Sequence, residues 1–435
     1  MVMASGELDR PRLLFFDVST GPRPAFYLPR LCARYDVHVM WIPSGNEVKD
    51  RARAAEFDKW CGHTTMRDQQ EAESRLVAFG RSWGAHGIMG FGEMTMEPVH
   101  AAANALGLPA NSAWSMRALR NKLEQRRMLA KAGVPVPAFA EVHSLDQLRE
   151  AFDQVGAPAI LKPLAGAGSM ATFRVDDPAE LAAVWTAACA SYASDPRGGD
   201  AQDFILEEFL IGVSPYTDPR YGPYTSVESL VQQGRIRHLA VTDKLLLMRN
   251  FRENGGILPS VLGGELVEEL YECATKAINA MGITNSGVHT EIMFTAKGPR
   301  VIEVNSRLGG GVTEMLHDSC GFDSVLARAA IATGRPQPEF PKPVRSAGYY
   351  TLQAPDFEAV LVQAPSADEL RALPEITDAE VPYAIGSRPA WQQGTPGGTI
   401  ARITAVADGP QPLLDLYDSL KPGGMFKFRP VEPSV

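Results

Sequence analysis

Residues 288–307 read VHTEIMFTAKGPRVIEVNSR. Apolar runs on both sides of Lys297 and Gly298 predict a β-hairpin with this pair in its turn. Glu291 and Glu303 are equally distant in sequence from Lys297, so a symmetric antiparallel pairing places their carboxylates directly opposite each other. Like charges in that position destabilise a hairpin, which suggests that the two carboxylates serve a function.

Further polar side chains extend this pattern. Asn305 and Arg307 share the parity of Glu303, so all three point to one face for as long as the strand continues. Two carboxylates and an amide oxygen on one face form a hard-oxygen site suited to Mg²⁺, with Glu291, Glu303 and Asn305 as candidate ligands. The alternative is a pair of solvated glutamates on an exposed sheet face. Arg307 and the glycine run at residues 309–311 favour the metal site over that alternative.

A second candidate site lies upstream. A short strand ends at Lys162, and the small-residue loop GAGS follows at residues 166–169. Its free backbone N–H groups can close over phosphates, although such clusters are about as often simple turns. The spacing fits neither the GxxxxGK[ST] loop nor a GxGxxG turn. Residues 205–210 (ILEEFL) then end a strand at paired glutamates, and this hinge can offer hydrogen bonds to an adenine edge.

The arrangement of predicted strands and helices indicates three units. Over residues 1–115, apolar runs separated by helical stretches predict an α/β domain with a parallel sheet. Residues 116–335 form a second unit, which opens on a basic helix over residues 116–132. Closely spaced prolines over residues 336–343 mark a linker, and short strands dominate a β-rich unit over residues 336–435.

Composition limits the classes of protein that remain possible. A length of 435 residues favours two or three domains. The net charge of −9 argues against nucleic-acid partners. No apolar run approaches the roughly 18 residues of a membrane span, and five scattered cysteines are typical of reduced, structural thiols. We therefore expect a soluble, cytoplasmic protein without membrane or nucleic-acid partners.

The order of these segments resembles the ATP-grasp superfamily, and within it the L-amino-acid ligases, which are carboxylate–amine ligases. The resemblance covers roughly residues 115–334, and the combination of motifs is specific although each motif alone is not. The similar stretches are AGVPVP (132–137), ILKP (160–163), LEEFL (206–210), SVE (226–228), TDK (242–244) and residues 288–307. The resemblance implies an α/β (α+β) ATP-grasp fold. A Rossmann-like N-terminal domain would precede a two-part nucleotide-binding unit with a mobile lid over about residues 137–212, and a β-rich C-terminal domain would complete the module.

The resemblance also implies where ATP binds. Lys122 and Lys162 would hold its α- and β-phosphates. Gly166, Gly168 and Ser169 would cover the β- and γ-phosphates. Glu207 and the backbone around Leu210 would read the adenine, in a hinge that includes Glu208 and Phe209. Lys244 would be a neighbour of the phosphates or of the substrate.

Catalytic roles follow from the same resemblance. Glu291, Glu303 and Asn305 would carry two Mg²⁺ ions, for which Mn²⁺ could substitute. Arg307 would lie over the reacting carboxylate and stabilise the acyl phosphate and the tetrahedral state that follows. His289 would be a neighbour of the phosphates or of the substrate.

Fewer residues indicate the other substrates. Glu253 belongs to a segment that resembles one beside the acceptor site of the family and could hold the ammonium of an α-amino acid. Glu93, at the end of a strand in the first domain, is a second candidate, and each could equally be a solvated loop glutamate. Gly310 joins Arg307 among the implied substrate contacts. Residues 211–225 lengthen the usual link after the hinge and form either part of a specific pocket or only a longer surface loop.

These features predict an ATP-dependent ligase that activates a carboxylate as an acyl phosphate and joins it to an amine. At least one substrate would be an amino acid, ADP and phosphate would be released, and a role in secondary metabolism is possible. An alternative is activation of bicarbonate or formate, although no biotin-attachment MKM is present. A non-catalytic nucleotide-binding regulator is less favoured because the candidate metal ligands and Arg307 are all present. Many members of the family are homodimers, but no feature here decides the oligomeric state.

Overall fold

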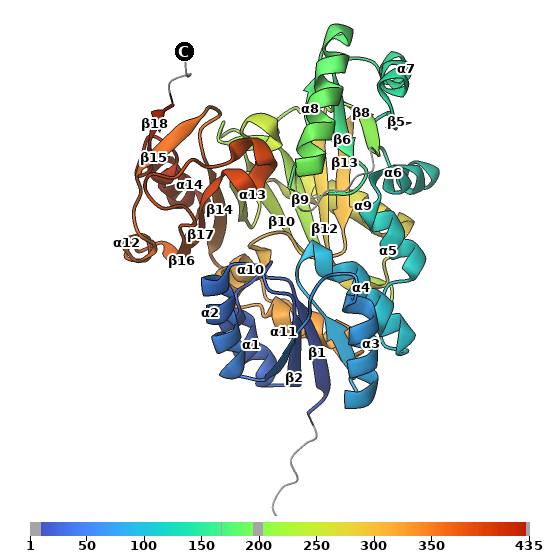
Figure 1. Ribbon diagram of the computed structural model, residues 1–435, viewed down its shortest axis with the longest axis vertical. Coiled ribbons are helices and arrows are strands. Elements are labelled where there is room, and N and C mark those ends of the chain that lie inside the picture. The colour runs from blue at the N-terminus through green and yellow to red at the C-terminus, as the bar shows by residue number, and fades with distance from the viewer. Residues whose placement is uncertain (1–9, 167, 195–202, 432–435) are drawn as a thin grey trace, which may run out of the picture.

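The computed structural model describes residues 10–166, 168–194 and 203–431. The strands of this part of the chain form four sheets. Figure 1 shows the N-terminal region in blue at the bottom, a green lobe at the top right and the orange-red C-terminal region at the left, around central strands.

The N-terminal domain contains a parallel sheet in the order β3-β2-β1-β4, so the predicted parallel strands are confirmed. The side chains of β1 are buried after its first residue because helices cover both faces of the sheet. The strands are β1 (Arg12–Asp17), β2 (Asp36–Trp41), β3 (Gly62–Thr65) and β4 (Gly87–Met89), and the helices are α1 (Pro24–Cys32), α2 (Glu47–Asp58), α3 (Ala72–Trp83) and α4 (Glu93–Ala105).

The basic segment after this domain is two helices, so the expectation of one continuous helix is wrong. Helix α5 (Ala113–Arg120) ends at Asn121, and α6 (Lys122–Lys131) begins directly after it. The Asn121 side chain accepts a hydrogen bond from the Glu124 amide, which caps the second helix and interrupts the first. The break places Lys122 at the first position of α6.

The lobe at the top of Figure 1 is a small sheet in the order β5-β8-β6-β7, with α7 (Leu145–Val155) and α8 (Leu181–Ser194) packed beside it. A hydrophobic core that includes Leu148, Leu161 and Phe204 lies between the sheet and these helices. Residues 195–202, which follow α8, lie outside the described residues. The strands are β5 (Phe139–Val142), β6 (Ala159–Pro163), β7 (Phe173–Val175) and β8 (Phe204–Glu208).

The largest sheet joins the second and third predicted units. Its eight strands run β13-β12-β9-β10-β11-β14-β17-β16, and the pairing of β11 with β14 connects the two units. The C-terminal strands are therefore an extension of the central sheet. The strands are β9 (Tyr221–Gln232), β10 (Arg235–Leu245), β11 (Gly255–Leu258), β12 (Asn285–Thr295), β13 (Gly298–Asn305), β14 (Ser346–Gln353), β16 (Ile376–Glu380) and β17 (Thr399–Ala407).

The remaining elements cover this sheet or close its C-terminal end. Helix α10 lies between the N-terminal domain and the C-terminal strands (Figure 1). The helices are α9 (Gly264–Ala280), α10 (Val312–Cys320), α11 (Ser324–Ala332), α12 (Ala367–Arg371), α13 (Gly394–Gly398) and α14 (Pro410–Leu420), and a separate pair of strands is β15 (Ala359–Gln363) and β18 (Lys427–Pro430). All five cysteines are free thiols. Within the described part of the chain, no helix has the length and apolar character needed to cross a bilayer.

Candidate active site

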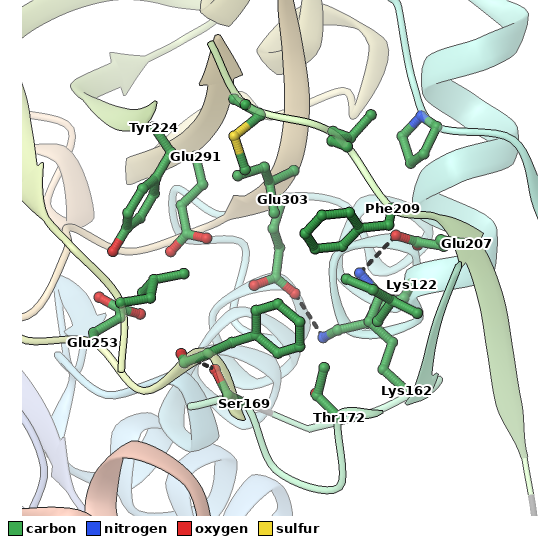
Figure 2. Close-up of a pocket in the computed structure, with 18 of the residues that line it drawn as sticks. Lys122, Lys162, Ser169, Thr172, Glu207, Phe209, Tyr224, Glu253, Glu291 and Glu303 are labelled. Atoms are coloured by element: carbon green, nitrogen blue, oxygen red, sulfur yellow. Dashed lines mark hydrogen bonds and ion pairs between the residues drawn. The ribbon is translucent and has the colours of Figure 1, made fainter. Parts of the chain in front are cut away.

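A cavity of about 360 Å³ lies between the small lobe and the central sheet. Figure 2 shows Glu303 near its centre, Glu291 and Glu253 on one side, and Glu207 with two lysines on the other. The predicted residues that line it are Lys122, Lys162, Gly166, Gly168, Ser169, Glu207, Glu208, Phe209, Leu210, Glu253, Glu291 and Glu303. The predicted residues outside its lining are Glu93, Lys244, His289, Asn305, Arg307 and Gly310.

The hairpin of β12 and β13 places Glu291 directly opposite Glu303, as the sequence predicts. The turn, however, is not centred on Lys297, because Thr295 pairs with Gly298. An irregularity in the pairing follows Glu291, and it shifts the register by one residue so that the two glutamates face each other. A β-bulge of this kind commonly re-aims side chains at active sites.

Lys122 reaches this carboxylate pair from the start of α6. Its Nζ lies 2.6 Å from Glu303 Oε1 and also donates to the Gly166 carbonyl at 3.0 Å. Burial alone would raise the pKa of Glu303, but the Lys122 ammonium outweighs it and holds that pKa at about 2. Glu303 is therefore ionised at neutral pH and available to a cation.

Glu207 is held by two cations at the end of β8. Arg126 Nε donates to Glu207 Oε1 at 2.9 Å, and Lys162 Nζ lies 2.8 Å from Oε2. The side chains of Arg126 and Glu207 are only 2% and 6% exposed. The expectation that Glu207 reads adenine stays a prediction, and its carboxylate is already engaged on both oxygens. Glu208, which pairs with Arg300 at 3.1 Å, is the more exposed carboxylate of the hinge.

His289 links the carboxylate pair to the interior of the sheet. Its Nδ1 lies 2.6 Å from Glu228 Oε1, and its Nε2 lies 3.1 Å from Glu291 Oε1. Burial lowers the pKa of His289, but the Glu228 carboxylate outweighs it and raises the pKa to about 9. As an imidazolium, His289 donates from both nitrogens, so it orients Glu291 and has no lone pair with which to accept a proton.

Arg307 lies beyond the end of β13 and reaches across to the N-terminal domain. Its Nε donates to Glu93 Oε2 at 2.9 Å, and its Nη1 donates to the Leu308 carbonyl at 3.1 Å. Glu93 is the first residue of α4 and not the end of a strand, so that part of the expectation is wrong. Because Glu93 already pairs with Arg307, it holds this guanidinium in place and is not a free partner for a substrate ammonium.

The glycine-rich loop is docked over the cavity. Ser169 Oγ donates to the Phe251 carbonyl at 2.8 Å, and the Thr395 amide of α13 donates to the Gly168 carbonyl at 3.1 Å. Ser169 has a φ of 59° and Gly168 a φ of 69°, a left-handed pair that turns this backbone sharply. Ala167 lies outside the described residues.

Comparison with known proteins identifies the central part of the chain. Residues 119–311 match the family described as the ATP-grasp domain. This segment is similar to an ATP-grasp domain. The fold is also similar to the crystal structure of an L-amino acid ligase from Bacillus licheniformis, with a TM-score of 0.75, 21% identity, and coverage of 97% of this chain and 100% of that one.

Proteins named as ligases and synthases are similar to part of this chain. The alanine–anticapsin ligase of Bacillus subtilis (strain 168) is 29% identical over 258 residues, which are 58% of this chain and 54% of that protein. Carnosine synthase 1 of Homo sapiens is 26% identical over 259 residues, which are 56% of this chain and 30% of that protein. The chain thus spans about half, or less, of the length of these relatives.

The donor set of the β12–β13 hairpin suits Mg²⁺. Among the described residues, no three His, Cys, Asp or Glu side chains gather into a ready-made metal site. Mg²⁺ usually needs only one or two protein carboxylates and takes its other ligands from phosphates and water. Glu291 and Glu303 supply those carboxylates, and the Asn305 amide donates to Glu303 Oε2 at 3.4 Å. These residues fit the ion.

Glu253 faces the cavity, and Lys244 lies behind it. Their charged groups are 3.6 Å apart, and Lys244 is buried. Burial lowers the pKa of Lys244, but Glu253 outweighs it and raises that pKa. Lys244 thus contacts Glu253, which lines the cavity, and does not line the cavity itself. Its contact with the phosphates or the substrate remains a prediction.

The sequence left open whether residues 211–225 shape a pocket or form only a longer surface loop, and the structure shows a different role for each part of the segment. Gly212, Pro223 and Tyr224 line the cavity. Between them, Tyr216 donates to the buried Asp243 at 2.8 Å, and Arg220 forms ion pairs with acidic residues of α14. The ends of the segment therefore shape the pocket, while its middle braces the C-terminal region.

Sequence reasoning did not single out Arg126, Glu228 or Phe251. Arg126 lies one helical turn after Lys122, so the shared face of α6 would have indicated it. Glu228 meets His289 only because β9 and β12 are neighbours, a pairing across 61 residues. No local signal marks such a contact.

Proposed function

We propose that this protein is an ATP-dependent carboxylate–amine ligase that forms an amide bond through an acyl phosphate. The observation that carries the proposal is the opposed pair Glu291 and Glu303, which borders a ligand-sized cavity next to Lys122. Lys122 and the His289 imidazolium partly offset the repulsion between these carboxylates, and both carboxylates still line the cavity. The names of the amino-acid ligase relatives support the same reaction class.

ATP would lie in the cavity between the small lobe and the central sheet. Lys122 and Lys162 project into it from α6 and β6, and Gly166, Gly168 and Ser169 cover it. The hinge at Glu208–Leu210 would receive the adenine, with backbone groups as its hydrogen-bonding partners. Mg²⁺, held by Glu291, Glu303 and Asn305, would neutralise the phosphate charge during transfer.

The chain's own residues then position and stabilise the reacting groups. Phosphoryl transfer to a carboxylate depends on in-line alignment and charge neutralisation, which the lysines provide. His289, as an imidazolium between Glu228 and Glu291, keeps the Glu291 carboxylate aimed at the cavity. Arg307, anchored by Glu93, would support the oxyanion that develops when the amine attacks.

The atoms balance without a covalent enzyme intermediate. The substrate carboxylate takes the γ-phosphoryl group and ADP leaves, and the amine then displaces phosphate to give the amide. The proton that the neutral amine loses leaves with the phosphate, which is released as hydrogen phosphate. The names alanine–anticapsin ligase and L-amino acid ligase support an amino acid as at least one substrate.

The test is phosphate release from ATP and Mg²⁺ across a matrix of amino acids, singly and in pairs, with mass spectrometry on each positive mixture. We expect release that needs a particular pair and a product mass equal to their sum minus water. Release with bicarbonate or formate alone would instead support a carboxylating or formyl-transferring enzyme. ADP binding without turnover on any substrate would support a nucleotide-binding regulator.

A further inference from the structure

A second cavity, of about 200 Å³, lies where the N-terminal domain, α10 and the C-terminal strands meet. It shares no lining residue with the nucleotide cavity. Its volume is more than ten times the roughly 10–15 Å³ that one ordered water needs, so it has room for an organic group. Figure 1 shows α10 at this junction.

Two ion pairs account for four of the charges in its wall. Arg23 Nη2 lies 2.7 Å from Asp378 Oδ2, and Arg402 Nη1 lies 3.2 Å from Glu380 Oε2. Asp378 also pairs with Arg371 Nε at 3.2 Å, so it is shared by two guanidinium groups. The arginines are therefore already matched to carboxylates.

Two carboxylates of α10, those of Glu314 and Asp318, have no cationic partner at ion-pair distance among the described residues. Asp318 accepts a hydrogen bond from Thr377 Oγ1 at 2.8 Å. Glu314 has no side-chain partner in the described part of the chain, and burial raises its pKa to about 7. The wall thus contains two carboxyl groups that have no ion-pair partner among the described residues.

The cavity adjoins the loop that follows Arg307. Tyr349 lines the cavity and packs against this loop so closely that a Cβ on Gly311 would lie 2.0 Å from its ring. A Cβ on Gly310 would lie 3.8 Å from the same ring. Tyr349 therefore borders both this cavity and the glycine loop that follows Arg307.

We propose that this cavity binds the cationic side chain of a basic amino-acid substrate, with Glu314 and Asp318 as the partners of its ammonium or guanidinium group. This inference rests on the proposed ligase function, whose substrate class it narrows. Phe26 and Ile403 in the same wall offer apolar contact to the methylene stem of such a side chain. A neutral side chain would leave both carboxylates unpaired.

The test is calorimetric titration of the full-length protein with L-arginine and with L-citrulline, its neutral isostere, in the presence and absence of ADP and Mg²⁺. We expect arginine to bind at least about tenfold more tightly than citrulline, and we expect Glu314→Gln to remove that difference. Glu272→Gln is the matched control, since it makes the same change at an exposed site on α9 that lines neither cavity. It should keep the preference.

Equal affinity for arginine and citrulline in the wild-type protein would overturn the inference. So would a preference that survives in Glu314→Gln, provided that ADP binding shows that variant to be folded. Binding is read without turnover, so the two proposals can fail separately. Glu314-dependent arginine binding without ligation would refute only the ligase, and ligation of neutral substrates without arginine binding would refute only this site.

Discussion

Arg307→Ala should nearly abolish amide formation while it leaves nucleotide binding intact. The Arg307 guanidinium is anchored by Glu93 at 2.9 Å and by the Leu308 carbonyl at 3.1 Å, and neither bond involves a residue of the nucleotide cavity. Loss of one donor to a developing oxyanion typically costs about 10²–10³ in rate, or about 2.7–4 kcal/mol. We therefore expect kcat to fall by that factor and the Kd for ADP to change by less than about threefold.

The assay combines product formation by mass spectrometry with calorimetric titration of ADP and Mg²⁺. Glu93→Gln is the informative companion, because it keeps the guanidinium and removes only its charged anchor. We expect a smaller loss of kcat for this variant, on the order of tenfold, with unchanged ADP affinity. Arg307→Lys keeps the charge but loses the planar geometry, and it should recover only part of the rate.

Two results would refute the reasoning. An Arg307→Ala protein that binds ADP much more weakly would show that Arg307 serves the nucleotide and not the reacting carboxylate. A folded Arg307→Ala protein with nearly wild-type kcat would show that no oxyanion develops next to this side chain.

Three further predictions concern charged groups inside the protein. Glu207→Gln leaves Arg126 and Lys162 buried without their counter-ion, so it should destabilise the protein by about 3–5 kcal/mol in urea unfolding, and a loss below about 1 kcal/mol would contradict this account. Glu303→Gln should raise the Mg²⁺ concentration needed for half-maximal activity by about tenfold or more, and an unchanged Mg²⁺ requirement would exclude Glu303 as a ligand. The pKa of Glu314 is raised from 4.5 to about 7 in the folded protein, so its contribution to stability is full below pH 4.5 and is lost as the pH rises through 7. This loss amounts to about 3 kcal/mol of unfolding free energy, and Glu314→Gln should remove this pH dependence. Wild-type and variant proteins whose unfolding free energies change in parallel with pH would refute the raised pKa.

The sequence by itself determined the hairpin, because pairing of neighbouring strands depends on short-range patterns. Apolar runs on both sides of a turn favour pairing of neighbouring strands, and side-chain parity then decides which residues share a face. The opposition of Glu291 and Glu303 followed from equal spacing about Lys297. The structure reaches the same pairing by a turn between Thr295 and Gly298 and a compensating bulge.

The tertiary structure alone decided which charges meet. Arg307 and Glu93 are 214 residues apart, and Lys122 and Glu303 are 181 residues apart. Burial then altered their chemistry, since the electrostatic effect of a partner grows as water is excluded. For this reason His289, an unremarkable strand residue in the sequence, becomes an imidazolium between Glu228 and Glu291.

The shared sheet is a second feature that no local pattern encodes. The prolines over residues 336–343 correctly marked a connection, but the strand that follows it pairs with β11 and extends the central sheet. Backbone hydrogen bonds between strands carry no sequence code of their own, so side-chain packing selects the partner. The chain's local sequence therefore determined the elements and the chemistry they carry, and long-range packing determined which of them form one site.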